Sequence, residues 1–193
     1  MIGMPRLVLP VLPAGSLATL AQPVLPGAGF VLRPWRPEDA PAVAAAYRDP
    51  AIQLWHARSL SLDEAAAWIG RWPGRWQAES GAGWGVADDR VLGQISLRTL
   101  DLAEGMAEIS YWVAPAARGR QVAARALNVL SRWAFDGVGL HRIEVQHSTR
   151  NPASCRVAER AGYPAEGTKR SQALHADGWH DMHLHARVAG DPG

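Results

Sequence analysis

The chain of 193 residues has a single cysteine and no long apolar run. Because the lone Cys155 cannot form a disulfide within the chain, a secreted domain built on disulfides is excluded. No run of about 18 apolar residues occurs, so no membrane span is expected. The apolar N-terminus is interrupted by Pro5, Pro10 and Pro13 and carries only Arg6 as a charge, so no signal peptide is expected. These absences predict a cytoplasmic protein.

The composition fits neither disorder nor a fibrous structure. Apolar residues make up 48% and charged residues 20% of the chain, an ordinary balance for a globular protein. Its 19 glycines and 14 prolines stay below the roughly 25–30% that marks low complexity. At roughly 100–200 residues per domain, the length predicts one domain. We expect residues 1–28, rich in proline and aliphatic side chains, to form an extended arm and residues 29–189 to form the domain.

Charge is distributed unevenly along the chain. The formal net charge is +2, but residues 114–170 hold ten basic side chains against four acidic ones, and the remainder holds ten against fourteen. A basic half facing an acidic half suits an anionic ligand on one side and a cationic ligand on the other. Nucleic acid is not expected as a partner, because the sequence contains no recognised binding module and no basic-aromatic run.

Hydrophobic periodicity and turn residues predict a mixed α+β sheet. A capping box at Ser61 and Glu64 begins one helix, and Asp49-Pro50 is expected to end the helix before it. Strands are predicted over residues 30–33, 84–87, 91–97, 108–113, 142–145, 163–174 and 180–188. Helices are predicted over residues 37–48, 61–77, 121–135 and 152–160.

One segment, between the strand ending at Val113 and the helix beginning at Gln121, indicates chemistry. Such a turn presents consecutive backbone N–H groups at a helix N-terminus, an arrangement that binds pyrophosphate. Arg118 and Arg120 add charge for further phosphates. Many strand-to-helix turns contain arginine and glycine without binding a ligand, so this segment alone leaves a purely structural turn as an equal alternative.

Three short motifs occur in one order along the chain. They are Leu32-Arg33-Pro34-Trp35-Arg36-Pro37-Glu38-Asp39, then Arg118-Gly119-Arg120-Gln121-Val122-Ala123 after a Glu-Ile-x-Tyr-Trp-Val strand, then Asn151-Pro152-Ala153-Ser154. With these motifs in this order, the chain resembles the GNAT superfamily of acyl-CoA-dependent N-acyltransferases. Within it, the chain resembles the RimJ/RimL-like branch of ribosomal-protein N-acetyltransferases. The resemblance covers residues 30–187. It implies a mixed, largely antiparallel seven-stranded sheet flanked by about four helices, with a splayed central strand pair.

The chain departs from the family pattern at two positions. Gln121 stands where the family usually has glycine, which lets the backbone approach the phosphates. We expect Gln121 to be tolerated in a helical backbone conformation with its side chain outward, so that cofactor binding survives in weakened form. Ala158 stands where many relatives place a tyrosine that protonates the leaving thiolate, so that role must fall to another group or to water.

The resemblance implies that acetyl-CoA, or another short acyl-CoA, is the co-substrate. The strand that includes residues 111–113 would splay from the neighbouring strand and pair with pantetheine through its backbone. The turn of residues 118–123 would hold the pyrophosphate. The implied cofactor-binding residues are Trp112, Val113, Arg118, Gly119, Arg120, Gln121, Val122, Ala123, Asn151 and Ser154.

The implied reaction is direct attack of a primary amine on the thioester, through a tetrahedral intermediate. The backbone N–H of Val113 is the candidate oxyanion donor, and Ser154 would donate a hydrogen bond near the thiol sulfur. Two carboxylates compete for the role of general base. Glu108 begins the strand beside the cofactor, and Glu144 lies on the adjoining strand; each could instead pair with a surface arginine.

No metal is expected. His180, His183 and His185 lie close together in sequence but lack a metal-binding spacing, and Cys155 is expected to be a small structural residue. Nine tryptophans are many for this length. Four of them would either line an acceptor pocket or simply pack in the core: Trp55, Trp72, Trp76 and Trp84.

The acceptor is left open between a protein N-terminus and a small amine, including an antibiotic. A homodimer is a family-level expectation only. The alternative function is a CoA-binding regulatory or sensor protein with little catalysis, which Gln121 and the missing tyrosine motivate. A third interpretation, a nucleic-acid-binding module that uses the basic half, has no motif to support it.

Overall fold

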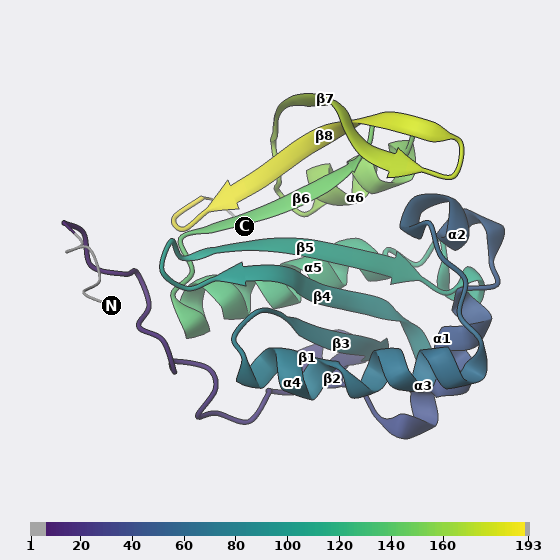
Figure 1. Ribbon diagram of the computed structural model, residues 1–193, viewed down its shortest axis with the longest axis horizontal. Helices are drawn as coiled ribbons and strands as arrows, with labels where there is room; N and C mark the ends of the chain where they lie inside the picture. Colours follow the sequence, from purple (N-terminus) through teal and green to yellow (C-terminus); the bar gives the residue numbers. More distant parts are fainter. Residues whose placement is uncertain (1–6, 192–193) are drawn as a thin grey trace, which may run out of the picture.

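The computed structural model describes residues 7–191, which form one eight-stranded sheet with helices on both faces (Figure 1). Its strand order is β1-β2-β3-β4-β5-β6-β8-β7. The strands are β1 (Leu25–Gly27), β2 (Phe30–Pro34), β3 (Ala82–Ala87), β4 (Val91–Asp101), β5 (Met106–Val113), β6 (Arg142–Ser148), β7 (Ala165–His175) and β8 (Gly178–Val188). The helices are α1 (Ala40–Ala46), α2 (Pro50–His56), α3 (Leu62–Gly70), α4 (Trp72–Gln77), α5 (Val122–Arg132) and α6 (Pro152–Arg160). Short helical turns η1 (Pro37–Asp39), η2 (Pro115–Ala117) and η3 (Trp133–Val138) complete the chain.

The centre of the sheet opens like a V between β5 and β6. Among the described strands, β5 and β6 are the parallel pair. They are paired only from Met106 opposite Arg142 to Ile109 opposite Val145. Beyond that point β5 continues to Val113 beside β4, while β6 continues beside β8. The expected fold class, a largely antiparallel mixed sheet with a splayed central pair, is therefore confirmed.

The sheet has eight strands rather than the expected seven. The additional strand, β1, lies at the end of the segment expected as an arm, where Leu25 is buried and pairs with Leu32 of β2. The strand was not predicted because proline usually interrupts a strand. Proline is tolerated in an edge strand, since on the outer side of such a strand no backbone N–H has to pair with a neighbouring strand. Further back, the backbone N–H groups of Val11 and Leu12 donate to carbonyls of the β4–β5 connection. Residues 1–6 of the expected arm lie outside the described part.

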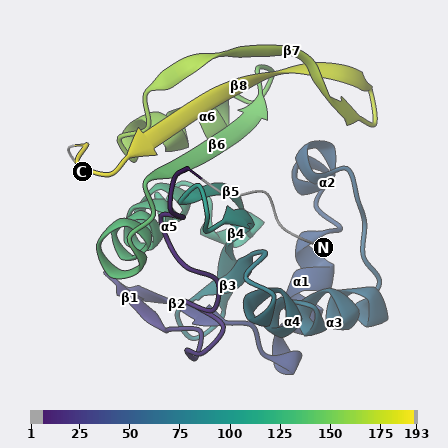
Figure 2. The same ribbon diagram turned by 60° about the vertical axis from the view of Figure 1, so that its left-hand side comes forward.

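The core consists of two clusters of buried side chains. Figure 2 shows α5 on one face of the sheet and α1, α3 and α4 on the other. Ile109 of β5 packs with Leu127 and Leu130 of α5. Trp112 of β5 points to the other face and packs with Val43 of α1 and Trp68 of α3. Within residues 7–191, no helix is both long and apolar enough to cross a membrane.

Two prolines set helix boundaries that differ from the expected ones. Asp49-Pro50 does end α1, but it also begins α2, because the Asp49 carboxylate accepts hydrogen bonds from the backbone N–H groups of Ala51 and Ile52. Residues 50–56, for which the sequence predicts neither helix nor strand, are thus helical. Farther on, the helix expected over residues 61–77 is divided into α3 and α4, with Pro73 in the first turn of α4.

The capping box that begins α3 is confirmed. The backbone N–H of Ser61 donates to the Glu64 carboxylate at 2.7 Å, and the backbone N–H of Glu64 donates to the Ser61 hydroxyl at 3.2 Å. Both bonds satisfy donors that an uncapped helix would leave without partners. This local device was readable from the sequence because its two residues are only three positions apart.

Candidate active site

Two cavities open on opposite sides of the V and meet at its centre. The turn-side cavity, about 460 Å³, is bordered by α2, the end of β5, the turn before α5 and the face of α6. The sheet-side cavity, about 370 Å³, is bordered by α2, α3, β4, β5 and β6. Five residues line both cavities and form a portal between them: Trp55, His56, Tyr111, Asn151 and Ser154. A long ligand in one cavity can therefore present its end to a second molecule in the other.

The backbone of β5 offers polar groups to this opening. The N–H of Ala114 donates to the carbonyl of Leu92 in β4 at 2.8 Å. Since N–H and C=O groups alternate sides along a strand, the Val113 N–H and the Tyr111 carbonyl point toward the splay. The Tyr111 carbonyl there accepts a hydrogen bond from His56 Nε2 at 3.2 Å. The Trp112 side chain is buried on the opposite face. By the same alternation its backbone N–H and C=O point to β4, where Trp112 pairs with Gln94, so Trp112 has no backbone group to offer a ligand in the splay.

The turn between β5 and α5 is shaped by two residues with positive φ. Gly119 has φ +78°, and Gln121, which precedes the first residue of α5, has φ +56° and ψ +23°. The expectation of a right-handed helical conformation at Gln121 is therefore wrong: the residue is left-handed, the region that favours glycine. The turn directs the N–H groups of Val122 and Ala123, in the first turn of α5, toward the turn-side cavity.

Replacing Gln121 with glycine is expected to stabilise the chain by about 0.5–1 kcal/mol. The left-handed backbone costs a residue with a Cβ roughly 1–2 kcal/mol, and the larger unfolded-state freedom of glycine offsets part of that gain. Thermal unfolding would show a rise in Tm of roughly 1–4 °C. Gln121→Ala is the matched control, because it removes the amide but keeps the Cβ; an equal shift in both variants would contradict the strain argument.

Both arginines of the turn already have acidic partners. Arg118 Nη2 lies 2.6 Å from Asp49 Oδ1, and this ion pair ties the turn to the N-terminus of α2. The hydrogen bond from Arg118 also lowers the pKa of the Asp49 carboxyl. Arg120 lies 3.9 Å from Asp88. Arg118 lines the turn-side cavity and Arg120 does not, whereas Arg160 at the end of α6 does. Sequence reasoning missed Arg160 because no sequence pattern distinguishes it from the other surface arginines of a helix.

The two candidate bases have different surroundings. Glu108 and Glu144 face each other in the β5–β6 register. Glu108 lines the sheet-side cavity and has one ionic partner, Arg98, at 3.2 Å. Glu144 accepts from Arg142 Nε at 2.8 Å and, within residues 7–191, borders neither of the two cavities. The geometry thus leaves Glu108 available to a bound molecule and engages Glu144 elsewhere.

A hydroxyl pair stands at the portal. The Tyr111 hydroxyl lies 2.7 Å from Ser154 Oγ. Asn151 caps α6 by accepting from the Ser154 N–H at 3.1 Å, which fixes the position of Ser154. Burial raises the pKa of the Tyr111 phenol well above its usual value, so the phenol keeps its proton at neutral pH. Sequence reasoning considered only the backbone of Tyr111 and did not predict that its side chain reaches the portal. Ala158, the other position considered for a proton donor, is fully buried.

His56 is a second portal residue that sequence reasoning missed. Burial lowers its pKa to about 4, so the imidazole is neutral at physiological pH. It comes from α2, which the sequence patterns assigned to a loop, and its contact with Tyr111 spans 55 positions. No local signal in the sequence indicates such a contact.

The four tryptophans proposed for an acceptor pocket separate into two pairs. Trp55 and Trp72 line the sheet-side cavity. Trp76 and Trp84 instead pack with Trp133 in the core, with ring centroids 6.3 and 5.5 Å from that of Trp133. Only the first pair can contact a bound molecule.

Three features together define an acyl-CoA-dependent N-acyltransferase. They are the splayed parallel pair β5–β6, the turn at the N-terminus of α5 and the portal between the two cavities. The Acetyltransferase (GNAT) domain family matches residues 30–164. The chain belongs to this family, and it is an N-acetyltransferase that uses acyl-CoA.

Named relatives point to the ribosomal-protein branch of the family. Over 140 residues the chain is 29% identical to YdaF of Bacillus subtilis, named "Putative ribosomal N-acetyltransferase", with 72% of this chain and 67% of that protein covered. Over 101 residues it is 29% identical to the ribosomal-protein-serine acetyltransferase of Escherichia coli, covering 52% of this chain and 56% of that protein. The solved structure of RimL, a ribosomal L7/L12 alpha-N-protein acetyltransferase in complex with coenzyme A, shares the fold, with a TM-score of 0.79 at 18% identity over 88% of this chain and 100% of that one.

Proposed function

We propose that acetyl-CoA binds in the turn-side cavity and transfers its acetyl group through the portal to a primary amine held in the sheet-side cavity. The observation that carries this proposal is the shared lining of the two cavities at Tyr111 and Ser154. An arrangement in which each substrate enters from its own side places amine and thioester in contact without a covalent enzyme intermediate.

The cofactor would be held by the backbone. The N–H groups of Val122 and Ala123 and of the turn residues Arg118 to Gln121 would bind the pyrophosphate, aided by the dipole of α5. Val113 would pair with pantetheine through its main chain, and Asn151 would contact it from α6. Arg160, which lines the same cavity, would bind a further phosphate of the cofactor.

The chemical steps would use three groups around the portal. Glu108, directly or through a water, would accept the proton that the ammonium must lose before attack. The Val113 N–H would stabilise the oxyanion. The Tyr111 phenol, supported by Ser154, would protonate the leaving thiolate and so take the role that Ala158 cannot serve. Glu144 would have no part in transfer, and none of these steps uses a metal.

The walls of the sheet-side cavity favour an acceptor with no positive charge besides its reacting amine. Three arginines line that cavity, Arg58, Arg75 and Arg98, against one carboxylate, Glu108. Burial keeps His56 neutral, so the wall is basic in sum, and a polycationic amine would be repelled. A peptide N-terminus followed by neutral or acidic residues meets this condition, which agrees with the names of the relatives.

An amine panel tests the acceptor class. Free-thiol release from acetyl-CoA and mass spectrometry of the products are expected to show kcat/KM roughly tenfold higher for peptides with acidic or neutral residues after the N-terminus than for matched peptides with lysine there. A peptide with a blocked N-terminus is the control. Preference for a polyamine would overturn the acceptor class, and tight CoA binding without turnover on any amine would favour a sensor.

The proposed setting is the cytoplasm, with residues 29–189 as the catalytic domain and residues 1–28 as an arm that contributes β1. A homodimer is also proposed. It is supported by the exposed Leu174 and Trp179, which are register partners near the tip of the β7–β8 hairpin and form an apolar surface.

A further inference from the structure

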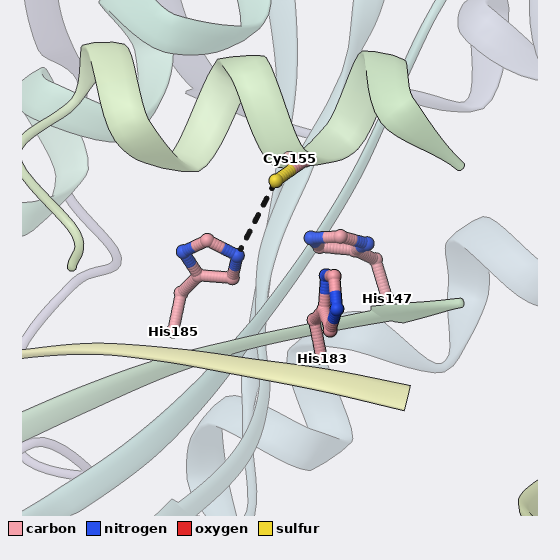
Figure 3. Close-up of side chains that lie close together, drawn as sticks. All are labelled: His147, Cys155, His183 and His185. Atoms are coloured by element: carbon pink, nitrogen blue, oxygen red, sulfur yellow. Dashed lines mark hydrogen bonds between the residues drawn. The ribbon is translucent and has the colours of Figure 1, made fainter. Parts of the chain in front are cut away.

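Three imidazoles and one thiol meet between α6 and the sheet. Cys155 of α6, His147 of β6, and His183 and His185 of β8 each offer one ligand atom, and these four atoms lie within 4.8 Å of one another. His147 and His183 are direct partners in the β6–β8 register. Figure 3 shows the Cys155 sulfur pointing from the helix toward the rings on the two strands. His147 and His185 are buried, and Cys155 and His183 are half-buried, in a place where apolar side chains would normally fill the space.

Nitrogen atoms of this group are buried without hydrogen-bond partners. His147 Nε2 and His183 Nδ1 have none within the described part of the chain. His147 is only 5% exposed and His185 is fully buried. A buried polar atom without a partner is costly, and most native proteins satisfy it. Two such atoms beside a thiol therefore suit a ligand that accepts lone pairs.

The backbone holds two of the rings in the orientation that metal ligation requires. His147 Nδ1 lies 2.8 Å from the Ser148 carbonyl, and His185 Nδ1 lies 2.9 Å from the Tyr163 carbonyl. Since a carbonyl only accepts, each Nδ1 carries the hydrogen and each Nε2 keeps its lone pair. His185 Nε2 is also 3.8 Å from Cys155 Sγ. Metal-bound histidines are typically oriented by such carbonyls.

We propose that His147, Cys155, His183 and His185 bind one zinc ion in a closed structural site. Tetrahedral zinc takes imidazole nitrogen at about 2.0–2.1 Å and thiolate sulfur at about 2.3 Å, which places ligand atoms roughly 3.3–3.6 Å apart. Small side-chain rotations would close the group from its present spacing. On binding, the Cys155 thiol loses its proton to solvent and the thiolate forms the Zn–S bond.

The charge of the group also balances. Zinc with one thiolate and three neutral imidazoles keeps one positive charge. The Glu159 carboxylate, with Oε1 3.6 Å from Cys155 Sγ, lies where it would offset that charge. Four protein ligands leave no open position for substrate or water, so the ion would be structural and would take no part in acyl transfer.

This group differs from the histidines whose spacing was judged unsuited to a metal. His180, one of those three, bonds instead to Ser148 Oγ and to Asp177. The fold replaces it with His147 and Cys155, which come from two other elements. The expected benefit is to α6: zinc would fix Cys155 to the sheet, and the residue directly before Cys155 in the helix is Ser154 of the portal.

Cobalt and zinc binding to the full chain, produced without a histidine tag and stripped with a chelator, tests the site. Co²⁺ is expected to bind at roughly one equivalent, with intense visible bands of tetrahedral cobalt and a thiolate charge-transfer band in the near ultraviolet, and Zn²⁺ is expected to displace it. Zinc should also raise Tm by several degrees, because it binds the folded state.

Matched variants locate the site. Cys155→Ser is expected to lose the charge-transfer band and His183→Gln to weaken binding more than about tenfold, while circular dichroism confirms folding. His141→Gln, an exposed histidine outside the group, should behave as wild type. Zinc binding weaker than about 1 μM by the unaltered chain, or a cobalt spectrum that Cys155→Ser leaves unchanged, would overturn the proposal. Neither measurement depends on acyl transfer.

Discussion

Replacing Glu108 with glutamine is expected to lower kcat/KM by roughly 10²–10⁴-fold. The amide keeps the size of the side chain but cannot accept the proton of the attacking ammonium. The loss should appear mainly in kcat, with the KM for acetyl-CoA little changed, because Glu108 borders the sheet-side cavity and not the turn-side cavity. Steady-state thiol release at saturating acetyl-CoA measures both values.

The pH profile separates a base from a residue that only shapes the cavity. Because Glu108→Gln removes the proposed proton acceptor, its rate should depend on pH differently from the wild-type rate. Glu144→Gln is the matched control: it lies across the register but bonds to Arg142, so its rate should stay within about threefold of wild type. Proton acceptance by Glu108 would be refuted by a Glu108→Gln enzyme with an unaltered rate and profile.

Replacing Tyr111 with phenylalanine is expected to lower kcat by roughly 10²-fold or more with acetyl-CoA. Without the phenol, the thiolate must leave unprotonated or take its proton from water. A donor whose thiol is more acidic needs less help, so an acetyl thioester of an electron-poor thiophenol should recover most of the lost rate. Parallel kinetics with the two donors give the measurement.

Tyr163 provides the control for this substitution. It is also a buried tyrosine, and its hydroxyl lies 2.6 Å from Ser131 Oγ, remote from both cavities. Tyr163→Phe should lose about 1 kcal/mol of stability through that hydrogen bond and keep kcat. If Tyr111→Phe were equally slow with both donors, protonation of the leaving group by Tyr111 would be untenable.

Local chemistry determined which parts of this fold could be predicted. The capping box of Ser61 and Glu64 and the helix-starting Pro152 act within one turn, so the sequence shows them. β1 and α2 were missed because Pro26 and Pro50 look like breaks, whereas one lies in an edge strand and the other in the first turn of a helix. Patterns of this kind give the type of an element more reliably than its ends.

The candidate site shows the same limit more sharply. The turn before α5 was found because its residues are consecutive, yet the left-handed conformation of Gln121 is set by the path of the chain into the helix. Glu108 and Glu144 look equivalent in sequence, and only the register and the position of Arg142 distinguish them. The Tyr111–Ser154 contact joins positions 43 apart, and no periodicity encodes it.

The short parallel pairing between β5 and β6 gives cofactor binding a consequence for the stability of the fold. Four residue pairs join the two halves of the sheet there. A cofactor bound in the opening would contact both halves and hold them together. Binding to the folded state at a hundred times Kd adds about 2.7 kcal/mol of stability. At low acetyl-CoA the chain would lose that added stability and would be easier to unfold and degrade. The lifetime of the enzyme would then follow the supply of its own substrate.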